Sequence, residues 1–321
     1  MLTLYAAARY PPVGADIQFH LDIARVYLSG QNGMFAPFVM QINKMPYPPI
    51  AHLLLLPAVA LGVGPDFVRW LQAFSFPVAL LIAMLFAKRF GLGETHALIS
   101  GLSLLGSNAF LDAVFQIRPE TLDVFIWFAV TYAFLLGKKK LAIASSLLGV
   151  YNHSFASLAM NGGELLFKGK KKTILIVALG SLPMMVVSLW FLPSMLSTWV
   201  GVPVNSQARL FLSDFPMFTV AYLGSLFVGL PVMFYQVTQW KKLCFLSQLS
   251  MVTLASALVM LPVWYDRYYH YAAIPLALIL GEFAVAHKKL RIVLVAVIVG
   301  FVVMNYSNLW AANFLGLWDI H

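Results

Sequence analysis

Acidic, histidine and arginine side chains gather in three short segments of a sequence that is otherwise strongly apolar. The candidate residues are Asp16 and His20 in segment 14–25, Arg118, Glu120 and Asp123 in segment 116–123, and Tyr265, Asp266 and Arg267 in segment 264–271. A carboxylate can act as a general base on a hydroxyl group or help to bind a divalent metal ion. Arginine holds phosphate through paired hydrogen bonds, and aromatic rings stack on sugars. Together these groups suit the transfer of a sugar from a lipid-linked phosphate.

Two of the segments have spacings that fit the beginning of a helix. If residues 14–20 are helical, Asp16 and His20 share one face, because they are four positions apart. Pro119 suits the first turn of a helix, and a carboxylate at Glu120 would then lie near the helix N-terminus, where negative charge is favoured.

Each segment also has a simpler interpretation. Asp16 and His20 could lie in a solvated loop, and Glu120 could be only an acidic residue at a helix start. Asp266 and Arg267 could form a salt bridge at the rim of an aromatic belt, and arginines near a membrane also extend their charged ends to water. The functional interpretation therefore depends on whether the three segments reach the same side of the molecule.

The composition indicates an integral membrane protein made of helices. Of 321 residues, 61% are hydrophobic and 10% are charged, whereas soluble domains have about 45–50% apolar and about 25% charged residues. Helices and closed barrels satisfy their own backbone hydrogen bonds in hydrocarbon. The apolar runs are continuous rather than alternating, which favours an all-α bundle of about 8–10 membrane helices.

The longest apolar runs are expected to cross the membrane. They fall near residues 67–87, 95–114, 119–137, 173–192, 217–238, 243–263, 268–286 and 290–310. Residues 141–167 lie between two lysine clusters, so they would enter and return as two short helices with a break near residues 151–153.

The whole chain, residues 1–321, is predicted to be a single membrane domain. Residues 1–66 would form an outer loop with juxtamembrane helices, including a re-entrant or interfacial helix at residues 48–63. Residues 67–310 would form the transmembrane bundle, and residues 311–321 a short outer tail.

The charged residues are predicted to divide between the two sides of the membrane. Lysine-rich connections between the runs are expected to face the cytoplasm. They hold 14 of the 21 basic residues, namely Lys88, Arg89, Lys138, Lys139, Lys140, Lys168, Lys170, Lys171, Lys172, Lys241, Lys242, Lys288, Lys289 and Arg291. Of the acids, only Glu94, Glu164 and Glu282 would share that side. The net charge of +9 is then explained by this bias and by contact with anionic lipid rather than nucleic acid. All three polar segments fall on the opposite, non-cytoplasmic side.

Short motifs follow one another in an order that resembles a known superfamily. The motifs are Gly-Ala-Asp-Ile-Gln-Phe-His at residues 14–20, Tyr47 before two prolines, Arg69, Arg-Pro-Glu at residues 118–120 and Arg-Tyr-Tyr at residues 267–269. This order, over residues 14–286, resembles the GT-C superfamily of membrane glycosyltransferases, which use sugars linked to a polyprenyl phosphate. Its members include protein O-mannosyltransferases, aminoarabinose transferases and the catalytic subunits of oligosaccharyltransferases. By comparison with them, the chain is expected to lack the first transmembrane helix.

The resemblance implies a role for each candidate residue. Asp16 would be the catalytic general base, with His20 orienting it or the acceptor. The substrate-binding residues would be Tyr47, His52, Arg69, Arg118, Glu120, Asp123, Tyr265, Asp266 and Arg267, with the arginines at the lipid phosphate. Asp16 and Glu120 are candidate ligands for a divalent metal ion, Mg or Mn, whose involvement is left open.

The resemblance also implies a reaction and a place. A hexose such as mannose would pass, with inversion, from the polyprenyl-phosphate donor to a glycan, protein or lipid acceptor. This would occur on the non-cytoplasmic face of a prokaryotic cell membrane. The alternatives are a transporter or lipid flippase, and a non-catalytic GT-C-like subunit. Transporters tend to place charge near the bilayer midplane and to contain repeats, neither of which is clear in this sequence.

Overall fold

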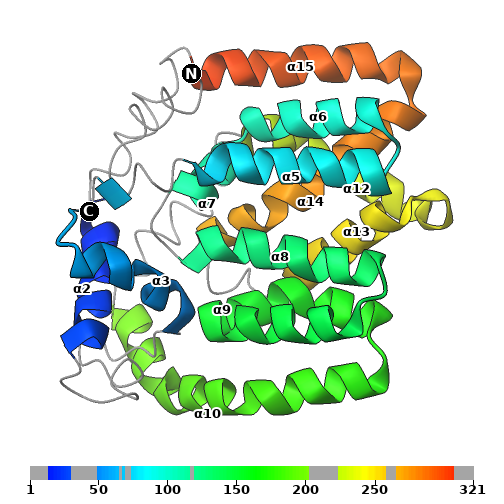
Figure 1. The fold of residues 1–321 in the computed structure, drawn as a ribbon. Helices are drawn as coiled ribbons and strands as arrows, with labels where there is room; N and C mark the ends of the chain where they lie inside the picture. Colours follow the sequence, from blue (N-terminus) through cyan, green and yellow to red (C-terminus); the bar gives the residue numbers. More distant parts are fainter. Residues whose placement is uncertain are drawn as a thin grey trace.

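The computed structural model describes residues 14–29, 49–64, 67–68, 74–115, 119–201, 223–257 and 265–306. Within these residues the regular elements are all helices, which confirms the predicted all-α class. Most helices lie side by side, with their ends on two opposite faces of the molecule (Figure 1).

The bundle contains α5 (Ser75–Phe90), α6 (Glu94–Leu105), α7 (Asn108–Phe115), α8 (Pro119–Leu135), α9 (Lys139–Lys168), α10 (Lys171–Gly201), η2 (Gly224–Val228), α12 (Gly229–Thr238), η3 (Trp240–Lys242), α13 (Phe245–Ala257), α14 (Tyr265–Ala286) and α15 (Lys288–Tyr306). Two further helices, α2 (Gly14–Ser29) and α3 (Pro49–Ala60), lie beside one end of the bundle (Figure 1). The helix predicted at residues 48–63 therefore corresponds to α3.

One of the predicted runs is divided into two helices. Residues 95–114 form α6 and α7, which are separated at Gly106 and Ser107. The amide of Ser225 donates to the carbonyl of Gly106 at 3.0 Å. Gly224, beside it, has a φ of 54°, and a Cβ there would strike the same carbonyl oxygen. Glycine at position 224 therefore allows η2 to pack against the junction of α6 and α7.

Helix α14 is the centre of the bundle. Its residues from Tyr271 to Leu280 are almost all apolar, and every one of them is buried against neighbouring helices. His96 of α6 connects α6 to α14 through a hydrogen bond. Its Nδ1 accepts from the amide of Leu92 at 3.1 Å, so its Nε2 carries the proton and donates to the carbonyl of Leu278 at 2.7 Å.

Helix α9 reverses direction within its length. Its residue His153 contacts Asp123 near the start of α8, whereas Glu164 contacts Thr131 near the end of α8. The second arm of α9 therefore runs parallel to α8, although the first arm begins directly after α8 ends. A Cβ at Gly149 would strike Ser157, eight positions later, which a straight helix would place about 12 Å away. The chain thus enters and returns as predicted, but residues 151–153 keep helical backbone where a break was predicted.

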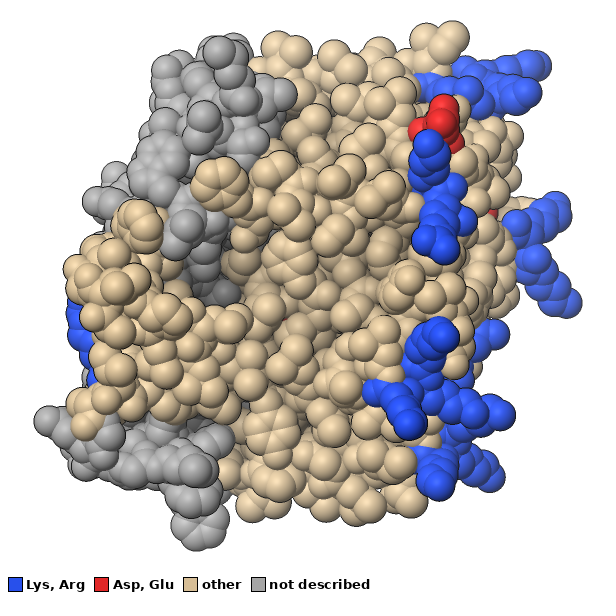
Figure 2. Space-filling model, viewed as in Figure 1, with Lys and Arg blue, Asp and Glu red and all other residues tan. Residues whose placement is uncertain are grey.

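Except for Arg25 of α2, the basic side chains of the described residues gather on one face (Figure 2), which we call the lysine face. It comprises Lys88, Arg89, Lys138, Lys139, Lys140, Lys168, Lys170, Lys171, Lys172, Lys241, Lys242, Lys288, Lys289 and Arg291. Figure 2 shows them at the ends of the bundle helices, and a few more charged atoms at the far edge of the molecule. On the lysine face Lys88 donates to Glu94 at 2.9 Å, and this hydrogen bond lowers the pKa of the exposed Glu94 carboxyl. The opposite end of the bundle, where α8 and α14 begin, is called the outer end.

Between these two ends the surface is apolar. Figure 2 shows a broad belt there without charged side chains. Large exposed apolar residues point outward from α5, α10 and α15, among them Leu81, Leu85, Leu179, Leu182 and Val293. By length and composition, one helix of the described residues could cross a membrane, Lys171–Leu189, and several shorter apolar helices accompany it. The number of membrane spans therefore stays a prediction.

Candidate functional site

Most of the predicted site residues have side chains outside the part of the chain that the structure describes. For Asp16, Glu120, Tyr265, Asp266 and Arg267 the helical backbone is described but the side chain is not. Tyr47, Arg69 and Arg118 lie outside the described residues altogether. The helix predicted for residues 14–20 is present as the start of α2. The remaining site residues, His20, His52 and Asp123, are described fully.

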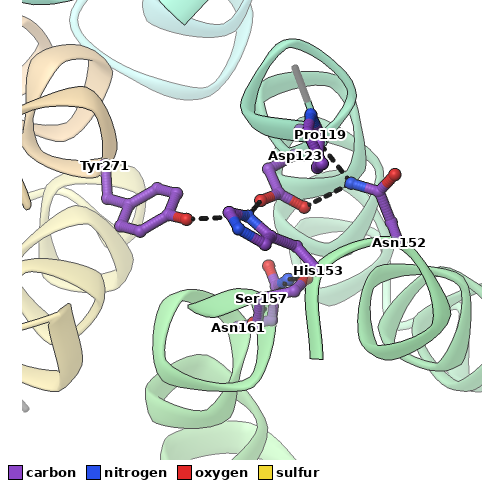
Figure 3. Close-up of polar contacts among 7 residues, drawn as sticks. All are labelled: Pro119, Asp123, Asn152, His153, Ser157, Asn161 and Tyr271. Atoms are coloured by element: carbon purple, nitrogen blue, oxygen red, sulfur yellow. Dashed lines mark hydrogen bonds and ion pairs between the residues drawn. The ribbon is translucent and has the colours of Figure 1, made fainter. Parts of the chain in front are cut away.

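Asp123 lies at the centre of a buried polar network that joins α8 to α9 (Figure 3). Its side chain has no solvent exposure. Asn152 Nδ2 donates to Asp123 Oδ1 and to the carbonyl oxygen of Pro119, both at 2.8 Å. His153 Nδ1 lies 2.6 Å from Asp123 Oδ2. Because a carboxylate accepts hydrogen bonds but cannot donate them, Nδ1 of His153 carries the proton in this pair.

A third helix completes the network. The hydroxyl oxygen of Tyr271, on α14, lies 2.9 Å from His153 Nδ1 and shares its proton with Asp123 as a second acceptor. The three helices α8, α9 and α14 are thus joined by one imidazole, as Figure 3 shows. Asp123 and Tyr271 lie within two turns of the N-termini of α8 and α14, so the network lies toward the outer end of the bundle.

His20 and His52 form a second buried pair, between α2 and α3. His20 Nδ1 lies 2.9 Å from His52 Nε2, and the ring of Tyr27 stacks on His52. Burial raises the pKa of the Tyr27 hydroxyl. Leu21 and Leu55 add a small apolar core between the same helices. The structure therefore brings together two predicted site residues, His20 and His52, and α2 also carries the backbone of Asp16.

We expect this histidine pair to hold α2 against α3. Replacing His52 with leucine removes one partner and leaves His20 without this buried hydrogen bond, at a cost of about 1–3 kcal/mol. Local unfolding of α2 would free the backbone at Arg25 from the helix, so tryptic cleavage after Arg25, followed by peptide mass spectrometry, should become faster by about tenfold or more.

The matched control is Leu54→Ala, because Leu54 is an exposed residue of the same helix. Replacing His20 and His52 together by leucine should recover part of the loss, since neither side chain is then left with an unmet hydrogen bond. If the His52 and Leu54 variants were cleaved at the same rate, the histidine pair would have no role in holding α2.

Sequence reasoning assigned Asp123 but missed the three side chains around it. Asn152 and His153 were considered only as a break between helices, and Tyr271 only as the end of an aromatic segment. One signal was available, because His153 is an ionisable residue inside an apolar stretch, and such residues are functional candidates. The contact itself depends on the reversal of α9 and could not be seen in the sequence.

Two of the acids predicted on the cytoplasmic side, Glu164 and Glu282, are buried within the bundle. Glu164 Oε1 accepts from Thr131 at 2.8 Å and from Thr253 at 3.1 Å. Glu282 accepts from the amide of Cys244 at 2.9 Å, just before α13 begins. Glu94 does lie on the exposed lysine face.

A metal site is not formed by the described side chains, since they contain no group of three or more histidine, cysteine, aspartate or glutamate residues that could hold an ion. Asp16 and Glu120, the alternative metal ligands from the sequence, have side chains outside this part of the chain.

No protein-family model matches the chain, and no curated protein sequence matches it. Among solved structures, the chain is similar to the crystal structure of ArnT from Cupriavidus metallidurans in the apo state, with a TM-score of 0.54 and 16% sequence identity. The match covers 84% of this chain and 54% of that protein, so the chain spans about half the length of ArnT. At this identity the likeness concerns the fold. The chain therefore shares the helical fold of ArnT over most of its length.

Proposed function

We propose that this protein is an integral membrane glycosyltransferase that takes a sugar from a polyprenyl-phosphate donor. The observation that carries this proposal is the likeness of most of the chain to ArnT, a GT-C transferase. The short motifs of the sequence lead to the same superfamily independently of that comparison.

The apolar belt supports the membrane location. Soluble proteins rarely expose such large contiguous apolar surfaces, whereas a lipid-facing surface requires them. The lysine face would contact the cytoplasm, because cytoplasmic loops carry an excess of lysine. The outer end, with the Asp123 network and helices α2 and α3, would then lie on the non-cytoplasmic side.

The chemistry we propose is a single inverting displacement at the outer end. A hydroxyl oxygen of the acceptor attacks the anomeric carbon of the donor sugar, and Asp16 removes the hydroxyl proton. The bond from the anomeric carbon to the phosphate oxygen breaks, and polyprenyl phosphate leaves with the bonding electrons. Arg69, Arg118 and Arg267 would neutralise that phosphate, while Tyr47, Glu120, Tyr265 and Asp266 would bind the sugar and acceptor.

A transporter or lipid flippase is the second candidate function. It is favoured by the buried acids Asp123, Glu164 and Glu282, because ionisable residues inside a membrane bundle often mark pathways for ions or protons. In a transferase, by contrast, the acids of the active site need only lie near the outer end of the bundle, and Asp123 lies there.

The test uses the purified full-length chain in liposomes that contain a polyprenyl-phosphate sugar labelled in the sugar. We expect label to move to an added acceptor mixture of lipid-linked glycans, peptides and lipids, with release of polyprenyl phosphate. Labelled donor that crosses the bilayer without release of polyprenyl phosphate would support the transporter instead. If neither process occurs with mannose, glucose or aminoarabinose donors, the proposed function is wrong for these sugars.

A further inference from the structure

We infer that Glu164 is a proton-binding site inside the bundle, where the carboxyl group carries a proton on Oε2 and donates it in a hydrogen bond to Asn161 Oδ1. The site lies among helices α8, α9 and α13. Its contact on α8, Thr131, is one turn before the end of that helix, so the site is in the half of the bundle nearer the lysine face. It uses no residue of the proposed transfer reaction and does not depend on that reaction.

Glu164 is enclosed without a basic partner. The residue is 0% exposed, and none of the ion pairs among the described residues includes it. Lys168 lies one turn later on α9, but its side chain is exposed. Its Nζ lies 4.9 Å from the ring centre of Phe167 and 4.7 Å from that of Phe245. Because an unpaired buried carboxylate is very costly, a group in this position takes up a proton and becomes neutral.

The hydrogen bonds to the two oxygens of Glu164 are unequal. Thr131 and Thr253 both donate to Oε1, at 2.8 and 3.1 Å. The indole Nε1 of Trp127 donates to the hydroxyl of Thr253 at 3.0 Å, which leaves the proton of that hydroxyl free for Glu164. Oε2 is buried, and no described residue donates to it. In a carboxylate both oxygens are acceptors, whereas a carboxylic acid has one carbonyl oxygen and one hydroxyl. The pattern fits Oε1 as the carbonyl oxygen and Oε2 as the hydroxyl.

A second buried oxygen without a donor lies one helical turn away. Asn161 precedes Glu164 by three positions on α9, so the two side chains are neighbours on the helix. Asn161 Nδ2 donates to the carbonyl oxygen of Ser157 at 3.0 Å and to Ser157 Oγ at 3.1 Å (Figure 3). These two bonds orient the amide, and its Oδ1 is buried with no donor among the described residues. One proton on Glu164 Oε2 would give both oxygens a partner.

Two other occupants fit the same oxygens less well. A buried water molecule can donate to two acceptors, but it would leave the negative charge of Glu164 uncompensated. A metal cation would compensate the charge, and hard cations do take carboxylate, hydroxyl and amide oxygens. Ca²⁺ takes about six to eight of them, whereas the oxygens without a donor here are Glu164 Oε2 and Asn161 Oδ1. A proton needs only these two.

The experiment records infrared spectra of the purified full-length protein near neutral pH, in a detergent without carbonyl groups. The difference between the wild type and Glu164→Gln isolates the vibrations of this carboxyl group. We expect the variant to lose one carbonyl stretching band of a protonated acid and no carboxylate band. Loss of carboxylate bands instead would overturn the inference.

Glu94→Gln is the matched control for the spectra. The Glu94 side chain is 83% exposed and pairs with Lys88, so it is a carboxylate in water. This variant should lose carboxylate bands and keep the band of the protonated acid. The pair of variants therefore compares a buried and an exposed glutamate in the same protein.

Asn161→Leu tests the acceptor of the proton. Without Oδ1 the hydroxyl of Glu164 loses its hydrogen bond, so the carbonyl band of the acid should persist and move to higher wavenumber. An unchanged band would remove Asn161 from the site. This variant keeps Glu164, so the shift still assigns the band if Glu164→Gln does not fold.

Thermal unfolding in detergent distinguishes a proton from a metal cation. Glutamine can accept from both threonines and donate to Asn161, so Glu164→Gln should unfold close to the wild-type temperature. Glu164→Leu should unfold several degrees lower, because the threonine hydroxyls lose their acceptor. If sodium chloride stabilised the wild type more than choline chloride did, and Glu164→Gln lacked this effect, a metal cation would replace the proton in the site and the inference would be wrong. No measurement here uses sugar transfer, so this inference and the proposed function fail independently.

Discussion

Replacing Asp16 with asparagine is expected to lower the rate of sugar transfer by about 100- to 10,000-fold, the usual contribution of a general base. An amide cannot accept the proton of the acceptor hydroxyl, although it has nearly the same size as the carboxylate. Donor binding should therefore change little. The measurement is release of polyprenyl phosphate in single-turnover conditions, together with donor binding to the purified protein measured by native mass spectrometry.

Asp22 provides the matched control, since it belongs to the same helix. It is about half exposed and pairs with Arg25 and Gln18 on the surface of α2. Exposed ion pairs of this kind contribute little to stability, so Asp22→Asn should transfer sugar at close to the wild-type rate. Equal activity of the Asp16 and Asp22 variants would remove Asp16 from the reaction.

Replacing Gly281 with alanine is expected to destabilise the bundle by about 1–3 kcal/mol, the usual cost of overpacking a core. A Cβ at this position of α14 would strike the ring of His96 and the hydroxyl of Ser100, and would lie 2.8 Å from the backbone oxygen of His96. The ring would have to move, which would break its hydrogen bond to Leu278. Glycine here lets α6 and α14 approach closely, as small residues do at contacts between membrane helices.

Gly300 on α15 is the comparison for this substitution. A Cβ at Gly300 would have no neighbour within 4 Å, and alanine favours helix more than glycine does. Gly300→Ala should therefore leave the thermal unfolding temperature of the detergent-solubilised protein unchanged or slightly raised, while Gly281→Ala should lower it clearly. Equal unfolding temperatures would mean that α6 and α14 are not in close contact.

The layout of the fold was largely predictable because it follows from hydropathy and lysine distribution. Long apolar runs have few alternatives to helix in a membrane. The lysine clusters at positions 138–140 and 168–172 required residues between them to enter and return, and α9 does so. The reversal lies between Gly149 and Ser157, around the predicted residues 151–153. That its residues would belong to one continuous helix was not predicted.

The candidate site was predictable only in part. His20 and His52 were chosen separately, and the structure pairs them across two helices. Asp123 was chosen as a ligand, but its burial and its contact with His153 depend on the packing of α8 against α9. The burial of Glu164 and Glu282 was also not predicted. Both residues lie close in sequence to lysines of the lysine face, but their side chains point into the bundle. There, threonine hydroxyls donate hydrogen bonds to Glu164, and a backbone amide donates one to Glu282.

The most direct test of the central claim is a structure of the full-length protein with a non-hydrolysable polyprenyl-phosphate sugar analogue. We predict that the sugar and its phosphate lie at the outer end, between α2 and the first turns of α8 and α14. Binding of the analogue at the lysine face, or anywhere away from α2, α8 and α14, would contradict the account.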